Sequence, residues 1–294
     1  MKKFRRILAL GLAAALMAAG LTACGGGGDY KTGLAVNANN TSSVSAGDEN
    51  GKAHSNIDVA AVLLDDKGKI VDVVIDVVQG IAPIDATGQI GIDVSTTFDS
   101  KHELGDDYNM RGASPIGAEW FEQAQAMQEW AIGKTAEDLA AVGPDAEGKM
   151  ADVDGLSGVT ITVTGMYNTL VQAVETAEAR GAGKGDTLGL GSEVSMGTSK
   201  PATADEEGKV QFDGTFAAMT FDKNGKVTSS IFDSTQPAIT FDAEGQISSD
   251  LEAEVKTKLE KQDEYNMRGA SPIGKEWFEQ SEAFSEYVKG MTAD

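Results

Sequence analysis

Two pairs of apolar, β-branched segments stand out along the chain, each interrupted by a short polar turn that contains glycine. The first pair covers 57–64 and 70–78, and the second covers 212–221 and 227–232. Runs of this length around a Gly-containing turn predict β-hairpins, and the Asn224-Gly225 turn strengthens the second prediction. A further short strand and turn are expected near 81–92 and 238–247.

Apolar residues then change to helical spacing. After Ser114-Pro115 they recur at Ile116, Trp120, Phe121, Ala124, Met127 and Ala131 until Gly133, and the same pattern follows Ser271-Pro272. Serine as N-cap and proline at the first helical position predict helices that begin at residues 115 and 272. Strands followed by helices, without regular alternation, indicate an α+β fold with an antiparallel sheet and packed helices.

These elements belong to a duplicated domain with an offset of 157 residues. Residues 106–123 match 263–280 at 16 of 18 positions, and Gly33-Leu34 is echoed more weakly by Gly189-Leu190. Copy two runs to Asp294 and contains no counterpart of 140–177. We therefore expect the role of that segment to occur once in the chain. We therefore expect a complete copy over 30–179, a linker over 180–186 and a partial copy over 187–294.

The amino terminus has the pattern of an export signal. Basic residues precede an apolar stretch over 7–20, which is shorter than the roughly 20 residues of a membrane span. Leu21-Thr22-Ala23-Cys24 and four glycines follow, which resembles the bacterial lipoprotein signal. The resemblance implies a signal peptide over 1–23, lipid on Cys24, a flexible tether over 24–29 and a place on the extracytoplasmic face of the cell membrane. A conventional signal cleaved near Ala23, with a free thiol left over, is the alternative.

Charge and composition narrow the classes of partner. The chain has 24 Lys and Arg against 46 Asp and Glu, a net charge of -22. Four of the cations lie in the first six residues, so the rest carries 20 minus 46, or -26. Such a body repels phosphate backbones, and we expect no nucleic-acid binding. One cysteine and two histidines, His54 and His102, exclude an internal disulfide, and we expect no metal site.

The segment that occurs once carries the candidate chemistry. Asp154 to Thr162 is a small-residue turn that leads into an amphipathic helix with its apolar stripe from Val163 to Val174, expected to end at Gly181. Free N–H groups at a helix start, with the hydroxyls of Ser157, Thr160 and Thr162, suit a phosphate or phosphodiester. The alternative is that one threonine only caps the helix.

Ser157-Gly158-Val159-Thr160, with Asp154 three residues earlier and Gly68-Lys69-Ile70 upstream, resembles the motif of the FMN-binding domain family of exported flavoproteins. The resemblance covers 57–178 and is clearest over 152–177. It implies FMN joined to Thr160 through a phosphodiester, a turn shaped by Ser157 and Gly158, and a role in electron transfer. It also implies a flavin transferase and redox proteins as partners. Val159 stands where the family has alanine, and Val163 replaces a small hydroxyl residue. The expected cofactor-binding residues are Asp154, Ser157, Gly158, Thr160 and Thr162.

The repeated Tyr-Asn-Met-Arg-Gly-Ala-Ser-Pro-Ile-Gly segment, here called the box, spans 108–117 and 265–274. Arg111 and Arg268 can clamp a carboxylate or phosphate there. The alternative is an ordered loop beside core residues Trp120 and Trp277. The box also supports a second function, a non-enzymatic surface lipoprotein that binds a ligand or a protein partner.

Overall fold

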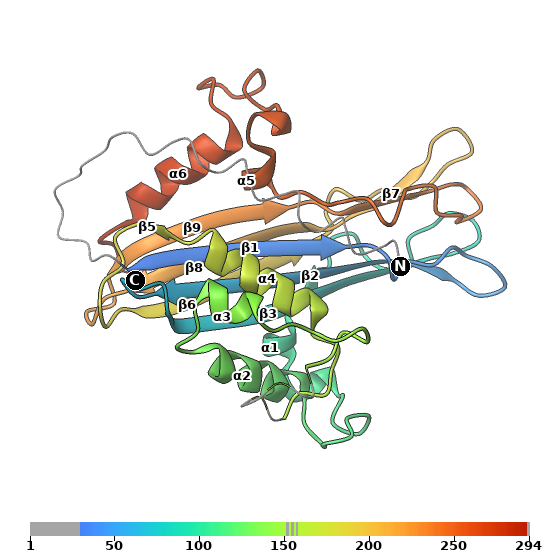
Figure 1. Ribbon diagram of the computed structural model, residues 1–294. Coiled ribbons are helices and arrows are strands. Elements are labelled where there is room, and N and C mark those ends of the chain that lie inside the picture. The colour runs from blue at the N-terminus through green and yellow to red at the C-terminus, as the bar shows by residue number, and fades with distance from the viewer. Residues whose placement is uncertain (1–29, 151–152, 154–155, 157, 293–294) are drawn as a thin grey trace, which may run out of the picture.

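The computed structural model describes residues 30–150, 153, 156 and 158–292 (Figure 1). The expected signal peptide, Cys24 and the glycine tether lie outside these residues. Among the helices that are described, none has the length and apolar character needed to cross a membrane.

The first predicted hairpin forms one edge of a four-stranded antiparallel sheet, sheet A. Its order is β3-β2-β1-β5, with β1 at Lys31–Asn39, β2 at Gly51–Leu64, β3 at Ile70–Ile84 and β5 at Glu178–Ala179. The turn between β2 and β3 closes because the Asp65 carboxylate accepts hydrogen bonds from the amides of Lys67 and Lys69, while Gly68 takes a positive φ of 75°. The predicted hairpin is confirmed.

The second hairpin forms the same structure in sheet B. The order is β4-β6-β8-β9, with β4 at Thr97–Phe98, β6 at Thr187–Ser195, β8 at Asp213–Phe221 and β9 at Val227–Thr235. Asp222 repeats the turn chemistry of Asp65. A two-stranded sheet extends the hairpin, with β7 at Gly208–Gln211 paired to β10 at Ala238–Phe241.

The two sheets pack face to face around a shared core. Buried side chains from both copies meet there, among them Val36, Ile57, Val59, Val78, Phe212, Phe216 and Phe241. The copies also exchange strands: β4 of copy one pairs with β6, with Phe98 opposite Val194, and Val255 of copy two bridges back to Ala38. The two copies are therefore interlocked.

Helices cover the outer face of sheet A. α2 (Trp120–Ala131), α3 (Ala136–Ala140) and α4 (Thr164–Glu175) bury a second core that includes Val62, Ile75, Met127, Leu139 and Leu170. The remaining short elements are α1 (Lys101–Leu104), η1 (Gly105–Tyr108), α5 (Lys258–Lys261) and η2 (Gln262–Tyr265). α6 (Trp277–Val288) packs on β9. In Figure 1, α5 and α6 lie above the strands, and α1 and α2 lie below them. The predicted α+β class with antiparallel sheets is confirmed.

The predicted helix starts at residues 115 and 272 are wrong. α2 begins at Trp120 and α6 at Trp277, because a buried glutamate takes over the preceding turn. The Glu119 carboxylate accepts hydrogen bonds from the amides of Met110 and Arg111 at 3.0 and 2.7 Å, and Glu276 does the same in copy two. The box is thus a folded loop, and Ser114 lies within it. The single-copy helix also ends earlier than predicted, since Thr176 rather than Gly181 follows its last turn.

Candidate functional site

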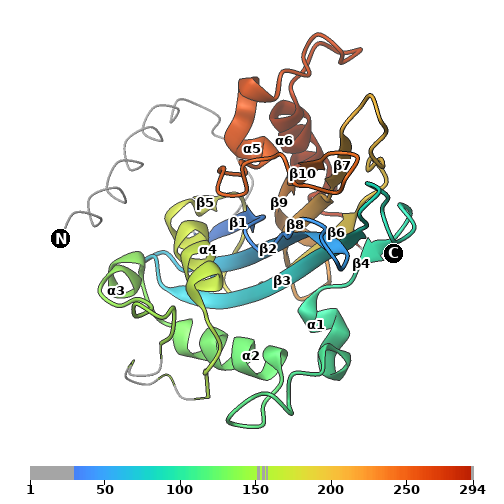
Figure 2. The same cartoon turned by 90° about the vertical axis from the view of Figure 1, so that its right-hand side faces the viewer.

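The predicted flavin motif leads directly into α4, which Figure 2 shows on the same side of sheet A as α2 and α3. Gly158 is exposed with a φ of 86°, a conformation that favours glycine. Val159 and Val163 are buried in the core beneath the helices, whereas Thr162 between them is exposed. The two buried valines therefore attach a short loop to the core, and the polar residues of this loop remain at the surface.

Thr160 is held by two side chains that no sequence motif indicated. Gln123 of α2 accepts hydrogen bonds at its Oε1 atom from the Thr160 amide at 2.8 Å, the Thr160 hydroxyl at 3.2 Å and the Ile161 amide at 3.2 Å. The Lys149 ammonium donates to the Thr160 carbonyl at 2.7 Å. Gln123 is fully buried, and a polar residue at a core position of the helical pattern was the signal available for it.

The start of α4 has no threonine cap. Its N-cap is Val163, which has no side-chain oxygen, so the alternative that a threonine only caps this helix is wrong. Val163 itself donates its amide to Gly148 at 2.7 Å. The positive end of the helix dipole thus lies next to Thr162, and the Lys149 ammonium is bound two residues earlier, at the Thr160 carbonyl.

A buried carboxyl lies under the first turn of α4. The Asp58 side chain packs so closely on Gly165 that a Cβ added there would lie 2.4 Å from an Asp58 oxygen. Burial raises the pKa of Asp58 to about 6, and the charge of Lys101 partly opposes that rise. The part of the chain that is described gives this carboxylate no hydrogen bond. Asp58 occupies the buried side of the helix start and leaves the exposed side open.

The structure accounts for the predicted site residues unevenly. Gly158, Thr160 and Thr162 lie in succession before α4, and Thr160 is the one held by Gln123 and Lys149. Asp154 and Ser157 lie outside the described residues.

The arginines of the box are engaged by residues within the box and directly beside it. Arg111 contacts Asp106 at 2.8 Å and Glu122 at 2.7 Å and also donates to the Gly117 carbonyl. Arg268 makes the same set of contacts in copy two, with Asp263, Glu279 and the Gly274 carbonyl. Their donors organise the loop, with Trp120 buried beside the first box and Trp277 half-buried beside the second.

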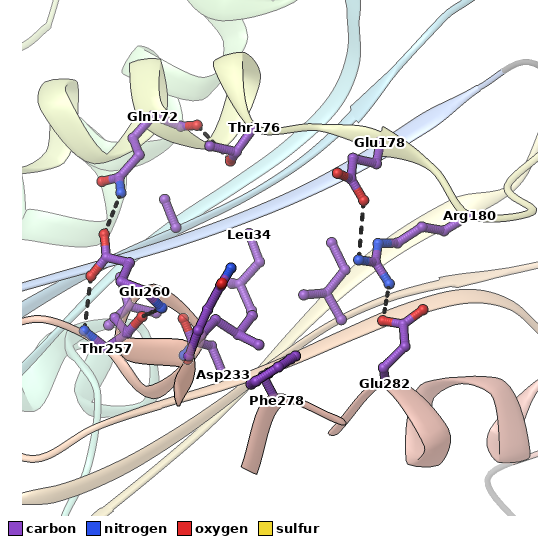
Figure 3. Close-up of a pocket in the computed structure, with 15 residues that line it drawn as sticks. Leu34, Gln172, Thr176, Glu178, Arg180, Asp233, Thr257, Glu260, Phe278 and Glu282 are labelled. Atoms are coloured by element: carbon purple, nitrogen blue, oxygen red, sulfur yellow. Dashed lines mark hydrogen bonds and ion pairs between the residues drawn. The ribbon is translucent and has the colours of Figure 1, made fainter. Parts of the chain in front are cut away.

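A cavity of about 500 Å³ lies at the far end of α4, between β1, β9, α5 and α6. Its apolar lining comes from Leu34, Val36, Ile231, Leu259 and Phe278. Figure 3 shows Gln172 hydrogen-bonded to Glu260 on one side and Arg180 between Glu178 and Glu282 on the other. No sequence pattern indicated this cavity, because its walls come from both copies.

Asp233 lines this cavity and is itself buried. Burial raises its pKa to about 6, against hydrogen bonds from Thr257 and from the amides of Leu259 and Ser234 that lower it. Within the described residues, no three His, Cys, Asp or Glu side chains are grouped so that they could hold a metal ion.

Comparison of the whole chain with protein-family models, with curated proteins and with solved structures finds no match.

Proposed function

We propose that this protein is an exported, lipid-anchored carrier of one FMN, joined through a phosphodiester to Thr160 and used in electron transfer. The observation that carries the proposal is the loop over 158–163, which enters the uncapped start of α4 with the Lys149 ammonium on the Thr160 carbonyl. The lipid on Cys24 and the glycine tether keep the carrier at the extracytoplasmic face of the membrane. Redox proteins and a flavin transferase are the proposed partners.

The residues around Thr160 suit a phosphate ester. Lys149 and the first amides of α4 offset its negative charge, which the acidic body would otherwise repel. Gln123 holds the backbone of Thr160 and Ile161, and these two bonds persist when the threonine oxygen becomes an ester and its hydroxyl hydrogen is lost. The isoalloxazine of FMN supplies one- and two-electron chemistry.

The first prediction tests Thr160. Protein expressed with a flavin transferase and FAD is expected to keep one flavin per chain after denaturation, measured by absorbance. Thr160→Ala is expected to remove it, because the ester oxygen is absent. Thr41→Ala is the matched control, since Thr41 is exposed and lies in the turn after β1, outside the predicted site. Covalent flavin on Thr160→Ala, or none on the wild type, contradicts the proposal.

Val159→Ala separates binding from stability. The variant has the alanine that the FMN-binding domain family has at this position, so the flavinylated fraction is expected to rise or stay unchanged. Because Val159 is buried in the core, the same change is expected to cost about 1–2 kcal/mol in the free energy of unfolding. A lower flavinylated fraction in protein that is still folded would argue against this role of the loop.

Cys24→Ser tests the anchor. The variant is expected to appear in the medium or to remain unprocessed, because no thiol can accept lipid. Mass spectrometry of a mature wild-type chain that begins at an unmodified residue would refute the anchor.

The cavity favours a second function, binding of a small ligand. Its volume lies within the roughly 300–1,000 Å³ of small-molecule sites. An apolar floor with four carboxylates and one arginine at its walls favours an apolar ligand that carries an amine. In a thermal-shift measurement, benzylamine is expected to raise the melting temperature and benzoate to leave it unchanged. Equal shifts would contradict this ligand chemistry.

A further inference from the structure

The outer face of sheet B corresponds to the face of sheet A that α4 covers. On sheet A, Ala60, Val62 and Leu64 of β2 are buried beneath the helices. Their counterparts at the 157-residue offset are Ala217, Met219 and Phe221 of β8, and all three are only half-buried. Among the described residues, α4 covers this face of sheet A and has no counterpart over β6 and β8 of sheet B.

α6 shows the same difference. Met127 and Trp130 of α2 are 0 % and 8 % exposed under the single-copy segment. Their counterparts Phe284 and Tyr287 are 50 % and 67 % exposed. The ring centroids of Phe284 and Phe232 lie 4.8 Å apart, and the Phe284 ring also stacks with Tyr287. We call the surface formed by the following residues the open face: Gly189, Gly191, Met219, Phe221, Phe284 and Tyr287.

The glycine that allows a helix to approach is present in both copies. Gly33 pairs with Val62, and Gly189 pairs with Met219, the counterpart of Val62, so the two glycines occupy equivalent places. A Cβ on Gly33 would lie 2.0 Å from the Ala173 carbonyl of α4. A Cβ on Gly189 would come no closer than 3.4 Å to the Phe221 ring, and one on Gly191 would meet nothing within 4 Å. The open face thus has room for a helix backbone to cross the sheet at Gly189, as α4 crosses it at Gly33.

Charge indicates which kind of helix fits. Asn37 of β1 donates hydrogen bonds to Thr169 and Gln172 of α4, both at 2.9 Å. The equivalent position on β6 is Glu193, because Asn37 pairs with Asp58 and Glu193 pairs with its counterpart Thr215. Glu193 is exposed, so a cationic side chain of a docked helix would be complementary to it at this place. A second copy of this chain, at a net charge of -22, would instead bring a second Glu193 or another acidic surface.

We propose that the open face is the docking site of a basic amphipathic α-helix from another polypeptide. Its apolar stripe covers Met219, Phe221 and the exposed aromatic rings of α6. A glycine or alanine of this helix packs on Gly189, as Ala173 packs on Gly33, and a lysine or arginine faces Glu193. The site is separate from Thr160 and does not depend on flavin.

The test uses the full chain and a labelled synthetic peptide with the sequence of residues 162–177, with and without Gln172→Lys, in fluorescence anisotropy. Both peptides are expected to bind, and the Gln172→Lys peptide up to about fivefold more tightly. That gain is expected to vanish on Glu193→Gln protein. Gly189→Leu is expected to weaken binding by about tenfold or more, because its side chain blocks the crossing while the free face has space for it. Gly47→Leu, at an open glycine elsewhere, is the matched control.

Variants of the exposed aromatic residues provide a second, independent test. Phe284→Ser is expected to weaken binding, whereas Ile273→Ser, at a residue 67 % exposed in the second box, is expected to have no effect. Three results overturn the proposal: no binding of either peptide, binding that Gly189→Leu does not change, or a concentration-dependent dimer in sedimentation that Gly189→Leu dissolves. The last result would assign the open face to a second copy.

Discussion

Asp58 and Asp233 are buried carboxyls whose pKa values both rise to about 6, yet their surroundings differ. Asp233 accepts hydrogen bonds from the Leu259 and Ser234 amides, whereas no hydrogen bond reaches Asp58 from the residues that the structure describes. A raised pKa means that the folded state holds its proton more tightly than the unfolded state does. The stabilisation is therefore complete below about pH 3.8 and is lost as the pH rises through about 6.

Asp58→Asn is accordingly expected to stabilise the protein in a pH-dependent way. The shift of about two pKa units corresponds to at most about 3 kcal/mol in the free energy of unfolding at pH 7 and above, and to almost nothing near pH 3.8. Urea unfolding between pH 4 and 8 measures it. Asp233→Ala is the comparison, and we expect it to destabilise because the amides of Leu259 and Ser234 lose their acceptor. A stability difference for Asp58→Asn that does not vary with pH would contradict this explanation.

At the scale of elements, α2 positions the loop before α4 through Gln123. Gln123→Leu is expected to speed hydrogen exchange at the Thr160 and Ile161 amides by about tenfold, because both lose their acceptor. Gln280→Leu is the matched control: Gln280 is the repeat counterpart and donates to Ser271 and the Lys275 carbonyl, but holds no such loop. Equal protection in Gln123→Leu and wild type would show that other contacts hold Thr160.

The elements also show which structural features a local sequence pattern can predict. Both hairpins were predictable because Asp65 and Asp222 close their turns with amides two and four residues away. The start of α2 was not, because Glu119 competes with Ser114 by binding amides eight and nine residues earlier in the chain. For the candidate site, the pattern placed Thr160 before a helix, but not Gln123 or Lys149. Those contacts span 37 and 11 residues and depend on tertiary packing.

At the scale of the whole molecule, the two copies share one core and exchange strands, so neither is expected to be stable alone. Residues 30–294 are expected to unfold in urea as a single transition by both circular dichroism and tryptophan fluorescence. Separate chains of 30–186 and 187–294 are expected to remain unfolded or to aggregate, because each exposes half of the core around Phe212 and Ile57. Two resolved transitions, or a fragment with a cooperative transition of its own, would show that the copies fold independently.

The reciprocal contacts of β4 with β6 and of Val255 with Ala38 are those of a two-fold symmetric dimer whose subunits have been joined in one chain. In such a dimer, every substitution appears on both halves at once. Fusion removes that constraint, so one half can acquire Asp58, a loop and α4, while the other has Thr215 and, among the described residues, no counterpart of α4. The two halves of this chain can therefore differ in sequence and structure, whereas the identical subunits of a homodimer cannot.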